Sequence, residues 1–328
     1  MTEGEHGLVL LRARSGAEVG MGHVMRSRAV GRELARLGAR VLFVVDDSRT
    51  ATAFSDEPFE VRLASDGWPD GPIRSAWLDG FLGWEEELER LGRRGVPAFL
   101  VENRIADRDR AERIVYPALH FVPDAWDSEH SDRVLAGAPW VPLAEDVLRT
   151  EPDRSRDIAL LVTFGGSDPN GLTERVLPLL DFVPGDLAIG VGHHMAGRRD
   201  RIRALAKDLE DRMSPERRVH VLDPGTRLAP WMARSRTALT ALGTTLYELA
   251  YLEVPALILA NYDDDRPALD WYRTHGPHLP IGVHDALVGL ELAAELRNRW
   301  SELTGRGARR PAGLGGGAVR IAHTLLAA

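Results

Sequence analysis

The stretch "GLVLLRARSGAEVGMGHVMRSRAVGRELARLGARVLFVVDD" (7–47) contains the pattern that decides the fold. Its apolar runs, 7–12 and 39–47, flank a glycine-rich turn and an amphipathic segment over 22–38. Continuous apolar runs of this length are typical of strands buried on both faces, and the amphipathic segment predicts a helix. A strand, a helix and a second strand in this order predict a parallel βαβ unit.

The same alternation continues along the chain and restarts after the polar stretch "RTEPDRSRD" (149–157), which predicts a linker. Before the linker, the pattern predicts strands over 74–80 and 97–102 and a helix over 84–95. After it, we expect strands over 158–168, 186–192, 218–223, 236–243 and 255–260, and helices near 171–181, 198–213, 227–234, 266–275 and 287–303, with a further helix from Thr244.

Two such runs predict an α/β protein with two doubly wound domains whose parallel sheets face a cleft. We expect an N-terminal domain over 1–150, a C-terminal domain over 157–310, and a glycine-rich segment with a helix over 311–328. That last segment is expected to pack back on the N-terminal domain.

Composition excludes several classes of function. The 328 residues carry 41 Lys and Arg against 49 Asp and Glu, a net charge of −8, which argues against nucleic-acid binding. Cysteine is absent, so disulfides, thiol catalysis and Cys-ligated zinc are excluded, and Lys207 is the only lysine. No apolar run approaches the roughly 18–20 residues of a membrane span. We therefore expect a cytoplasmic protein without membrane insertion.

The turn "GAEVGMGHVMR" (16–26) predicts a catalytic base. Gly20 and Gly22 let the backbone approach a ligand closely. His23 falls in the first turn of the following helix, where the helix dipole favours a neutral imidazole. Arg26 lies on nearly the same face and can hold phosphate oxygens. This arrangement suits activation of water next to a phosphorylated leaving group; the alternative is a tight turn with a helix-capping histidine.

The turn "TFGGSDPNG" (163–171) predicts a phosphate site without matching a dinucleotide or Walker motif. Gly165 and Gly166 offer backbone N–H groups, and Ser167 a hydroxyl, close to a helix start. The alternative is a plain strand–helix connection in which Asp168-Pro169 begins the helix.

The stretch "ALGTTLYELAYLEVPAL" (241–257) has a similar shape, with Gly243, Thr244 and Thr245 at the start of a helix. Glu248 is a single polar residue in an otherwise apolar helix, which favours a buried or ligand-facing carboxylate over a solvent-facing one. A carboxylate in this position can bind both hydroxyls of a ribose.

These motifs together resemble a known family. In order and spacing, 12–43, 163–177 and 242–257 resemble the nucleotide-sugar hydrolases of pseudaminic acid biosynthesis, which hydrolyse UDP-2,4-diacetamido-2,4,6-trideoxy-β-L-altropyranose. The pattern is similar to that of spore-coat polysaccharide proteins and, more distantly, of the glycosyltransferases that add N-acetylglucosamine to lipid-linked muropeptide. The resemblance covers about residues 1–280.

The resemblance implies a GT-B fold in which the C-terminal domain holds most of a UDP-sugar. The "FGGSD" turn would approach the diphosphate, and Glu248 would hold the ribose. His23 would be the base, and Arg12 or Arg26 would face the anionic side of the substrate. Water would attack the anomeric carbon with inversion and UDP would leave, with no metal or cofactor required. The expected partner is this small molecule; the oligomeric state is left open.

Departures from the family pattern predict a divergent substrate. The family has Asp-His-Tyr-Gly where this chain has Asp79-Gly80-Phe81-Leu82, so Asp79 and Phe81 are expected near the sugar without a tyrosine hydroxyl. The family's Asn-Gln after a late strand corresponds to Asn261 by proximity or to Asp264-Asp265 by counting. Its aspartate after the first strand is Arg14 here. Two alternatives therefore stand: a glycosyltransferase with a soluble acceptor, and a nucleotide-sugar-binding protein without catalysis.

Overall fold

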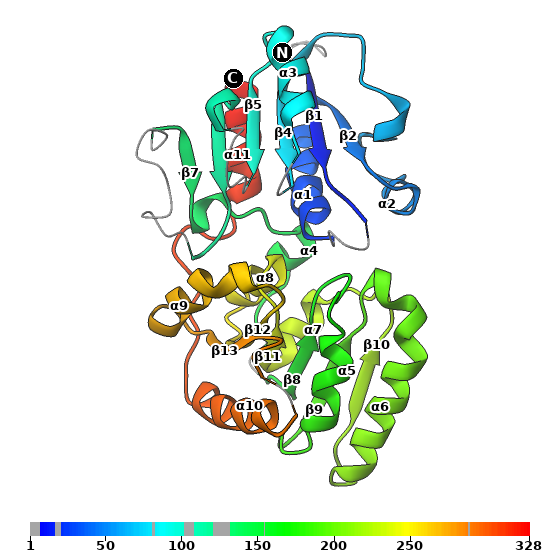
Figure 1. The fold of residues 1–328 in the computed structure, drawn as a ribbon, viewed down its shortest axis with the longest axis vertical. Coiled ribbons are helices and arrows are strands. Elements are labelled where there is room, and N and C mark those ends of the chain that lie inside the picture. Colours follow the sequence, from blue (N-terminus) through cyan, green and yellow to red (C-terminus); the bar gives the residue numbers. More distant parts are fainter. Residues whose placement is uncertain are drawn as a thin grey trace. The chain divides into compact units, whose positions relative to one another are not determined.

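The chain forms two compact units in the computed structural model, which describes residues 7–16, 21–80, 83–101, 108–120, 132–153, 155–287 and 289–328. The first unit comprises Met1–Ala144 together with Ala312–Ala328, and the second comprises Glu145–Pro311. Figure 1 shows each unit as a sheet covered by helices.

The sheet of the first unit has seven strands among the described residues, in the order β3-β2-β1-β4-β5-β6-β7. All of its strand pairs are parallel. The strands are β1 (Leu8–Ala13), β2 (Arg40–Val45), β3 (Glu60–Leu63), β4 (Ile73–Asp79), β5 (Ala98–Val101), β6 (Arg113–Tyr116) and β7 (Val134–Ala136), and the helices are α1 (Gly22–Arg36), α2 (Ser48–Ala53), α3 (Glu85–Arg93) and α11 (Gly317–Ala327).

Both faces of this sheet are covered by helices. Successive strand residues point to opposite sides, so each strand contributes to two apolar clusters. Leu11 and Phe43 pack in one cluster with α1 and α11, and Leu10 and Leu78 pack in another with α3. Continuous apolar runs follow directly from burial on two sides.

Helix α11 is an integral part of the first unit although it lies far along the chain (Figure 1). Ile321 and Leu325 are buried in the cluster that α11 shares with α1. The hydroxyl of Ser75 in β4 donates to the carbonyl of Leu325 at 2.8 Å. Gly317 makes the close approach possible, since a Cβ there would lie 2.7 Å from the backbone nitrogen of Val141 and closer still to its carbonyl.

The sheet of the second unit has six strands among the described residues, in the order β10-β9-β8-β11-β12-β13, again all parallel. The strands are β8 (Ile158–Thr163), β9 (Asp186–Gly190), β10 (Val219–Leu222), β11 (Ser235–Thr240), β12 (Ala256–Ala260) and β13 (Leu279–Val283), and the helices are α4 (Glu145–Leu148), α5 (Leu172–Val176), α6 (Arg199–Arg212), α7 (Ala229–Arg234), α8 (Thr244–Tyr251), α9 (Arg266–Thr274) and α10 (Gly289–Thr304).

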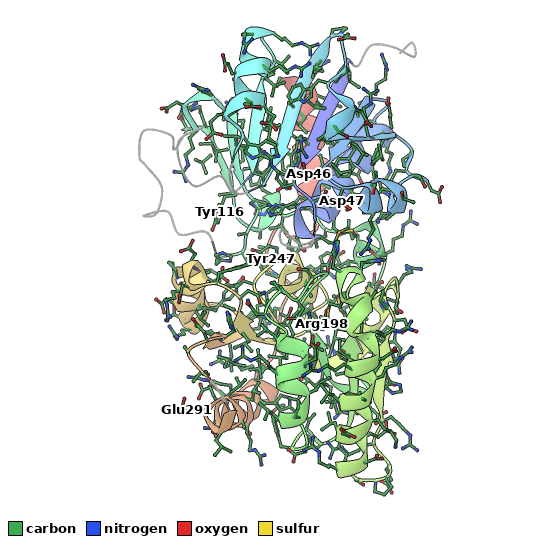
Figure 2. The ribbon with its side chains drawn as sticks, turned by 45° about the vertical axis from the view of Figure 1, so that its right-hand side comes forward. Asp46, Asp47, Tyr116, Arg198, Tyr247 and Glu291 are labelled. Atoms are coloured by element: carbon green, nitrogen blue, oxygen red, sulfur yellow. The ribbon has the colours of Figure 1, made fainter. Side chains whose placement is uncertain are left out.

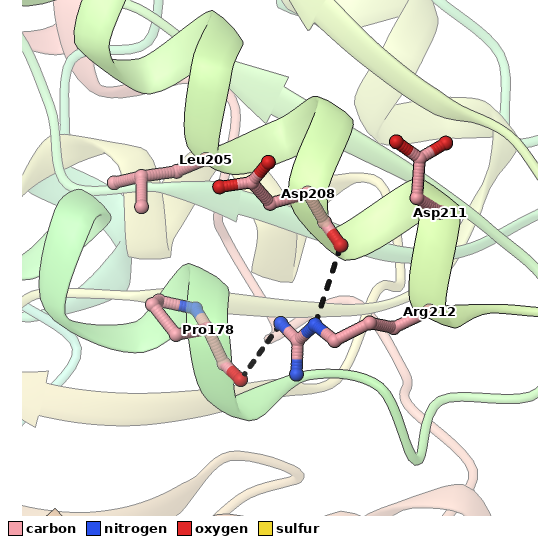
Figure 3. A pocket seen from close by; sticks show the side chains of 5 residues that line it. All are labelled: Pro178, Leu205, Asp208, Asp211 and Arg212. Carbon is pink, nitrogen blue, oxygen red and sulfur yellow. Dashed lines mark hydrogen bonds between the residues drawn. The ribbon is translucent and has the colours of Figure 1, made fainter.

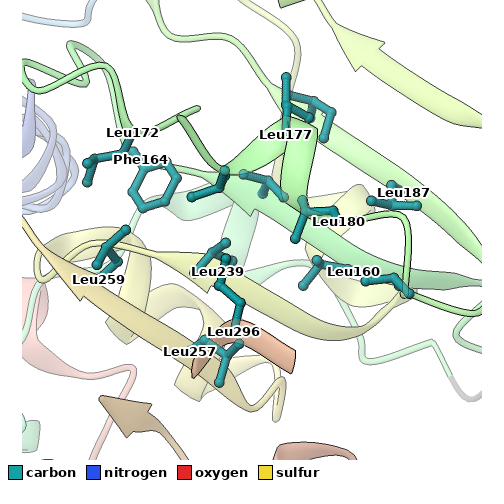
Figure 4. Close-up of a cluster of buried hydrophobic side chains, with 14 of the residues drawn as sticks. Leu160, Phe164, Leu172, Leu177, Leu180, Leu187, Leu239, Leu257, Leu259 and Leu296 are labelled. Atoms are coloured by element: carbon teal, nitrogen blue, oxygen red, sulfur yellow. The ribbon is translucent and has the colours of Figure 1, made fainter. Parts of the chain in front are cut away.

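One face of this second sheet carries a continuous apolar core, drawn in Figure 4. Leu160, Leu239 and Leu257 come from neighbouring strands, and Leu296 of α10 packs against them. Phe164 closes the core just beyond β8, immediately before the glycine turn. The core therefore fixes the point at which that turn leaves the sheet.

The predicted α/β class with parallel sheets is confirmed, and the differences are local. Strands β3, β6 and β7, which are three or four residues long, were not predicted. Strand β13 was missed because Pro280 and Gly282 disfavour a strand and are tolerated at its edge position. The helix predicted near 171–181 ends at Val176 and continues as a 3₁₀ turn, η6 (Leu177–Leu179), which contains Pro178. Within the described ranges, no helix combines the length and apolarity that crossing a membrane requires.

Candidate functional site

Most of the predicted site residues that the structure describes lie near the topological switch point of their sheet. Strand β1 lies between β2 and β4, and β8 lies between β9 and β11. In open parallel sheets, ligands bind beyond the carboxyl ends of the strands where the strand order reverses. The turn that carries His23 follows β1 and Asp79 ends β4, while Gly165 follows β8 and Gly243 follows β11. Each unit therefore presents its own candidate site.

Asp79 and His23 form a buried pair in the first unit. Asp79 ends β4 directly beside Ala13 of β1, and its side chain is fully buried. Its Oδ1 lies 2.7 Å from His23 Nδ1. Nδ1 must carry the proton, because an unprotonated nitrogen at this distance would oppose its lone pair to that of the carboxylate. In the neutral ring, Nε2 is then the basic nitrogen.

Arg26 holds the same carboxylate from the other side. Its Nη2 donates to Asp79 Oδ1 at 2.6 Å, its Nε donates to Oδ2 at 2.7 Å, and the hydroxyl of Ser27 adds a bond of 3.1 Å. Burial raises the pKa of Asp79, but the charges of Arg26 and His23 and their hydrogen bonds outweigh burial and lower it below its ordinary value. Arg26 Nη2 also lies 2.9 Å from His23 Nδ1, so the guanidinium, the imidazole and the carboxylate form one compact buried cluster.

These contacts join Asp79, Arg26 and His23 in an arrangement that the sequence did not predict. The sequence analysis expected both side chains at the substrate, whereas the structure shows them buried and joined to each other. Their direct contact with a substrate stays a prediction. His23 is buried as well, with 4% of its surface exposed.

Arg12 is likewise engaged by a carboxylate. It lies near the end of β1, buried, and forms an ion pair with Asp46, which follows β2 and is labelled in Figure 2. The backbone N–H of Ser15 donates to Asp46 Oδ2 at 3.0 Å, and the N–H of Asp46 donates to the Ser15 hydroxyl at 2.9 Å. These reciprocal bonds join the turns after β1 and β2.

The ends of the first two strands thus involve residues that sequence analysis missed. The only signal for Asp46 was a carboxylate at the end of an apolar run. Gly22 is the first residue of α1, as expected from the turn. Gly20 and Phe81 lie outside the described residues.

The glycine turn after β8 is shaped by its neighbours. Gly165 has a φ of +82°, a left-handed conformation that favours glycine. The carbonyl of Gly166 accepts a hydrogen bond from His194 N at 3.0 Å. Gly192 packs on the same turn, since a Cβ there would lie 2.5 Å from the carbonyl oxygen of Gly165 and closer still to that of Gly166. The close backbone approach at Gly192 was not predicted.

Asp168 caps helix α5 and so reduces the number of backbone N–H groups that could bind a phosphate. Its fully buried carboxylate accepts bonds from Leu172 N at 2.7 Å and Thr173 N at 2.9 Å, and Arg198, labelled in Figure 2, donates to its carbonyl at 2.8 Å. The first-turn amides of α5 are therefore taken by the chain itself. The hydrogen bonds found within the described residues do not use the N–H groups of residues 165–167, which remain the donors this turn offers.

Helix α8 offers a second set of donors beside that turn. Thr240 of β11 pairs with Thr163 of β8, so Gly243 and Gly165 follow adjacent strands. Gly243 precedes the helix with a φ of +153°, and no side chain caps its first turn. Thr244 and Thr245 are the first two helical residues, both half-exposed. An uncapped helix start beside a glycine turn favours an anion.

Glu248 lies one turn further along α8. Its side chain is half-buried, and desolvation, with a smaller contribution from the charge of Asp146, raises its pKa to about 8. Its carboxyl group has no hydrogen-bond partner among the described residues. A carboxyl group in this state can accept or donate toward ligand hydroxyls.

Of the two alternatives after β12, the structure ties Asn261 to the glycine turn. Asn170 Nδ2 donates to the backbone and side-chain oxygens of Asn261, both at 3.1 Å. Asp264 is exposed in the 3₁₀ turn η8 (Asp263–Asp265). The loops that follow β8 and β12 therefore meet across the end of β11.

A hollow of about 430 Å³ lies elsewhere in the second unit (Figure 3). Pro178, Leu205, Asp208, Asp211 and Arg212 line it. These residues lie near the C-terminal ends of η6 and α6, hence at the amino edge of the sheet, away from the switch point. The part of the chain that the structure describes holds no group of three or more His, Asp or Glu able to bind a metal.

Comparison with solved structures decides the fold. The chain is similar to MurG of Acinetobacter baumannii (13% identity, 98% of this chain and 100% of that one, TM-score 0.68). It is also similar to the glycotransferase of kitacinnamycin (16% identity, 98% of each chain, TM-score 0.65). The chain has the GT-B fold. A UDP-GlcNAc 2-epimerase of Neisseria meningitidis, solved with UDP-GlcNAc, shares this GT-B fold at 12% identity, 98% and 100% coverage, and a TM-score of 0.58.

Sequence comparison does not assign the chain to a family. No family model matches it. An uncharacterized protein of Methanocaldococcus jannaschii is 23% identical in an alignment 278 residues long, which covers 78% of this chain and 56% of that protein. The chain thus spans about half the length of this curated relative. These likenesses establish the GT-B fold, while the particular hydrolase family stays a prediction.

Proposed function

We propose that this GT-B protein is a nucleotide-sugar hydrolase that cleaves the anomeric C–O bond of a UDP-linked sugar with inversion. The observation that carries the proposal is the buried His23–Asp79 pair, 2.7 Å apart, at the switch point of the first unit. A histidine with a carboxylate on Nδ1 is the arrangement that general-base catalysis uses, because it fixes the tautomer and stabilises the imidazolium that forms.

In the proposed reaction, His23 Nε2 takes a proton from water as the water oxygen bonds to the anomeric carbon. The bond from that carbon to the β-phosphate oxygen breaks, and its electron pair leaves with UDP. Arg26 keeps Asp79 ionised, so the carboxylate can compensate the positive charge that develops on the ring. Asp79 and Arg26 thus act as positioning residues.

The nucleotide is assigned to the second unit. Backbone N–H groups of Gly165, Gly166 and Ser167 and the uncapped start of α8 supply donors for the diphosphate. Glu248 supplies a carboxyl group for the ribose hydroxyls. The choice of UDP over other nucleotides follows the sequence resemblance.

A glycosyltransferase is the second candidate, favoured by the likeness to MurG and to the kitacinnamycin glycotransferase. The same base would then deprotonate an acceptor hydroxyl in place of water. The two candidates differ in whether UDP is released without an acceptor.

Proton NMR of UDP-linked amino sugars, followed in real time, tests the proposal. Free UDP and an inverted free sugar are expected with the wild type and not with His23→Ala. His323→Ala, which removes an exposed histidine of α11 in the same unit, is the matched control and keeps activity. UDP release only after addition of a soluble acceptor would establish the transferase. Binding without turnover in either condition would refute catalysis.

A further inference from the structure

Arg14 is held at the edge of the His23–Asp79 pair. It follows β1 directly, and its backbone N–H donates to the carbonyl of Asp79 at 2.9 Å. Its guanidinium carbon lies 4.3 Å from the centre of the Trp84 ring. Trp84 is fully buried and donates from Nε1 to the carbonyl of Gly80 at 3.1 Å. The guanidinium is therefore stacked on a platform that cannot move freely.

The backbone around Arg14 leaves room for this side chain in particular. A Cβ on Gly80 would overlap Cγ of Arg14 and lie 3.1 Å from the Trp84 ring. The carbonyl of Gly83 accepts a hydrogen bond from Arg14 Nη2, and Gly83 has a φ of +79° that favours glycine. Gly80, Gly83 and Trp84 together form a seat that fixes where the guanidinium lies.

The donors of Arg14 are only partly used. Among the described residues its side chain makes one hydrogen bond, to Gly83. The carboxylates of Asp46 and Glu87 lie 3.7 and 3.6 Å away, close enough to balance the charge but beyond hydrogen-bond distance. Asp46 is held more closely by Arg12 and the N–H of Ser15. The Arg14 side chain keeps 29% of its surface exposed, and several of its N–H donors have no partner in the described ranges and can serve a ligand.

We propose that Arg14 binds a carboxylate on the sugar of the substrate, so that the enzyme acts on an acidic, uronate-type nucleotide sugar. The planar guanidinium matches a carboxylate through two parallel hydrogen bonds. Because Asp46 and Glu87 already balance the charge, such paired bonds contribute more to recognition than net charge does. This inference rests on the proposed function, since it assigns the sugar of that same substrate.

Isothermal titration calorimetry with UDP, UDP-glucose and UDP-glucuronate tests the inference. The wild type is expected to bind UDP-glucuronate about ten- to a hundredfold more tightly than UDP-glucose, the range for hydrogen bonds to a charged group. Arg14→Gln removes this preference, and Arg14→Lys, which keeps the charge without the fork, retains a part of it. Arg90→Gln is the matched control, because Arg90 stacks on Trp68 at 4.9 Å on the exposed side of α3, and it keeps the full preference.

The outcomes separate the inference from the proposed function. UDP binding with equal affinity for the two nucleotide sugars would overturn the inference and leave nucleotide binding intact. A preference for UDP-glucuronate that persists in Arg14→Gln would overturn the role of Arg14. Failure of the wild type to bind UDP and both sugars would instead overturn the proposed function. Urea midpoints of Arg14→Gln and Arg14→Lys that equal the midpoint of the wild type show that the affinities are compared between folded proteins.

Discussion

Asp79→Asn tests the central pair most directly, because it keeps the shape of the side chain and removes its charge. Asp79 accepts four hydrogen bonds in a fully buried position, two on each oxygen. An asparagine can accept on its one oxygen only. Its amide would face two donors, from Arg26 and either Ser27 or His23, at the other position.

The expected loss of stability follows from these bonds. Removing two bonds to a charged group costs about 1.5–3 kcal/mol each, and leaving Arg26 as a buried cation without its partner costs about 3–5 kcal/mol by an independent comparison. We therefore expect the first unit to lose about 3–5 kcal/mol in free energy of unfolding. We expect UDP release to fall by about 10²–10⁴-fold, the contribution that a positioned general base typically makes.

Glu57→Gln is the matched control for Asp79→Asn. Glu57 is also a buried carboxylate held by arginines of α1, accepting from Arg28 and Arg32 at 2.6 Å, but it lies away from the switch point. Those arginines are 26% and 33% exposed, so water can solvate them when the charge is lost. We expect a loss of about 1 kcal/mol and unchanged turnover.

Urea unfolding followed by tryptophan fluorescence gives the free energies, and NMR of UDP release gives the rates. Comparable losses of stability in the two variants, or full turnover in Asp79→Asn, would refute the role given to the buried pair. The pH dependence of the free energy of unfolding is a further check. Because the pKa of Asp79 is lowered in the folded protein, its stabilising effect is present at neutral pH and is lost as the pH falls through that lowered value.

Three further predictions concern the second unit. Gly192→Ala should lower the free energy of unfolding by about 1–3 kcal/mol and weaken UDP binding, since its Cβ would meet two carbonyls of the glycine turn, while Gly197→Ala, with open space around it, should do neither; equal effects in urea titrations would contradict this. The affinity for UDP-glucose should rise from pH 6 to pH 8 as Glu248, with its pKa of about 8, ionises and accepts the ribose hydroxyls, and should be flat in Glu248→Gln; calorimetry showing the same slope in both proteins would exclude that contact. Burial lowers the pKa of His278 from 6.5 to about 3, so the free energy of unfolding should fall by up to about 1.4 kcal/mol per pH unit as the pH drops below 6.5. His278→Gln should show a shallower loss between pH 6.5 and 4 in urea titrations. An unchanged slope in that variant would contradict the prediction.

The sequence predicted the parts of the fold that local pattern determines. Long apolar strands buried on both faces were visible as runs, whereas most residues of the short strands β3, β6 and β7 are not fully buried and form no such run. Helical spacing placed Arg26 on the face of His23. The carboxylate between them comes from a strand 56 residues from His23, and no local pattern encodes that distance.

The same limit applies to the second unit. Glycines in a turn after β8 were visible, but Asp168 takes the amides of α5 that a phosphate would use, which depends on its buried side chain and a φ of +43°. The need for glycine at position 192 depends on its contact with the carbonyls of Gly165 and Gly166, which the sequence does not reveal. Contacts between distant strands and close backbone approaches are set by tertiary structure, so local sequence patterns do not predict them.

The return of α11 to the first unit has a consequence for how the protein is made. The first unit needs Ala312–Ala328 to complete its core, while Glu145–Pro311 is continuous in the chain. On the ribosome, the second unit can therefore finish folding before the first, whose Ser75 and α1 must wait for Ile321 and Leu325 to be synthesised. During that interval the apolar face that α11 later covers is exposed to chaperones, and a nascent chain stalled before residue 312 would carry an unfinished first unit and a finished second one.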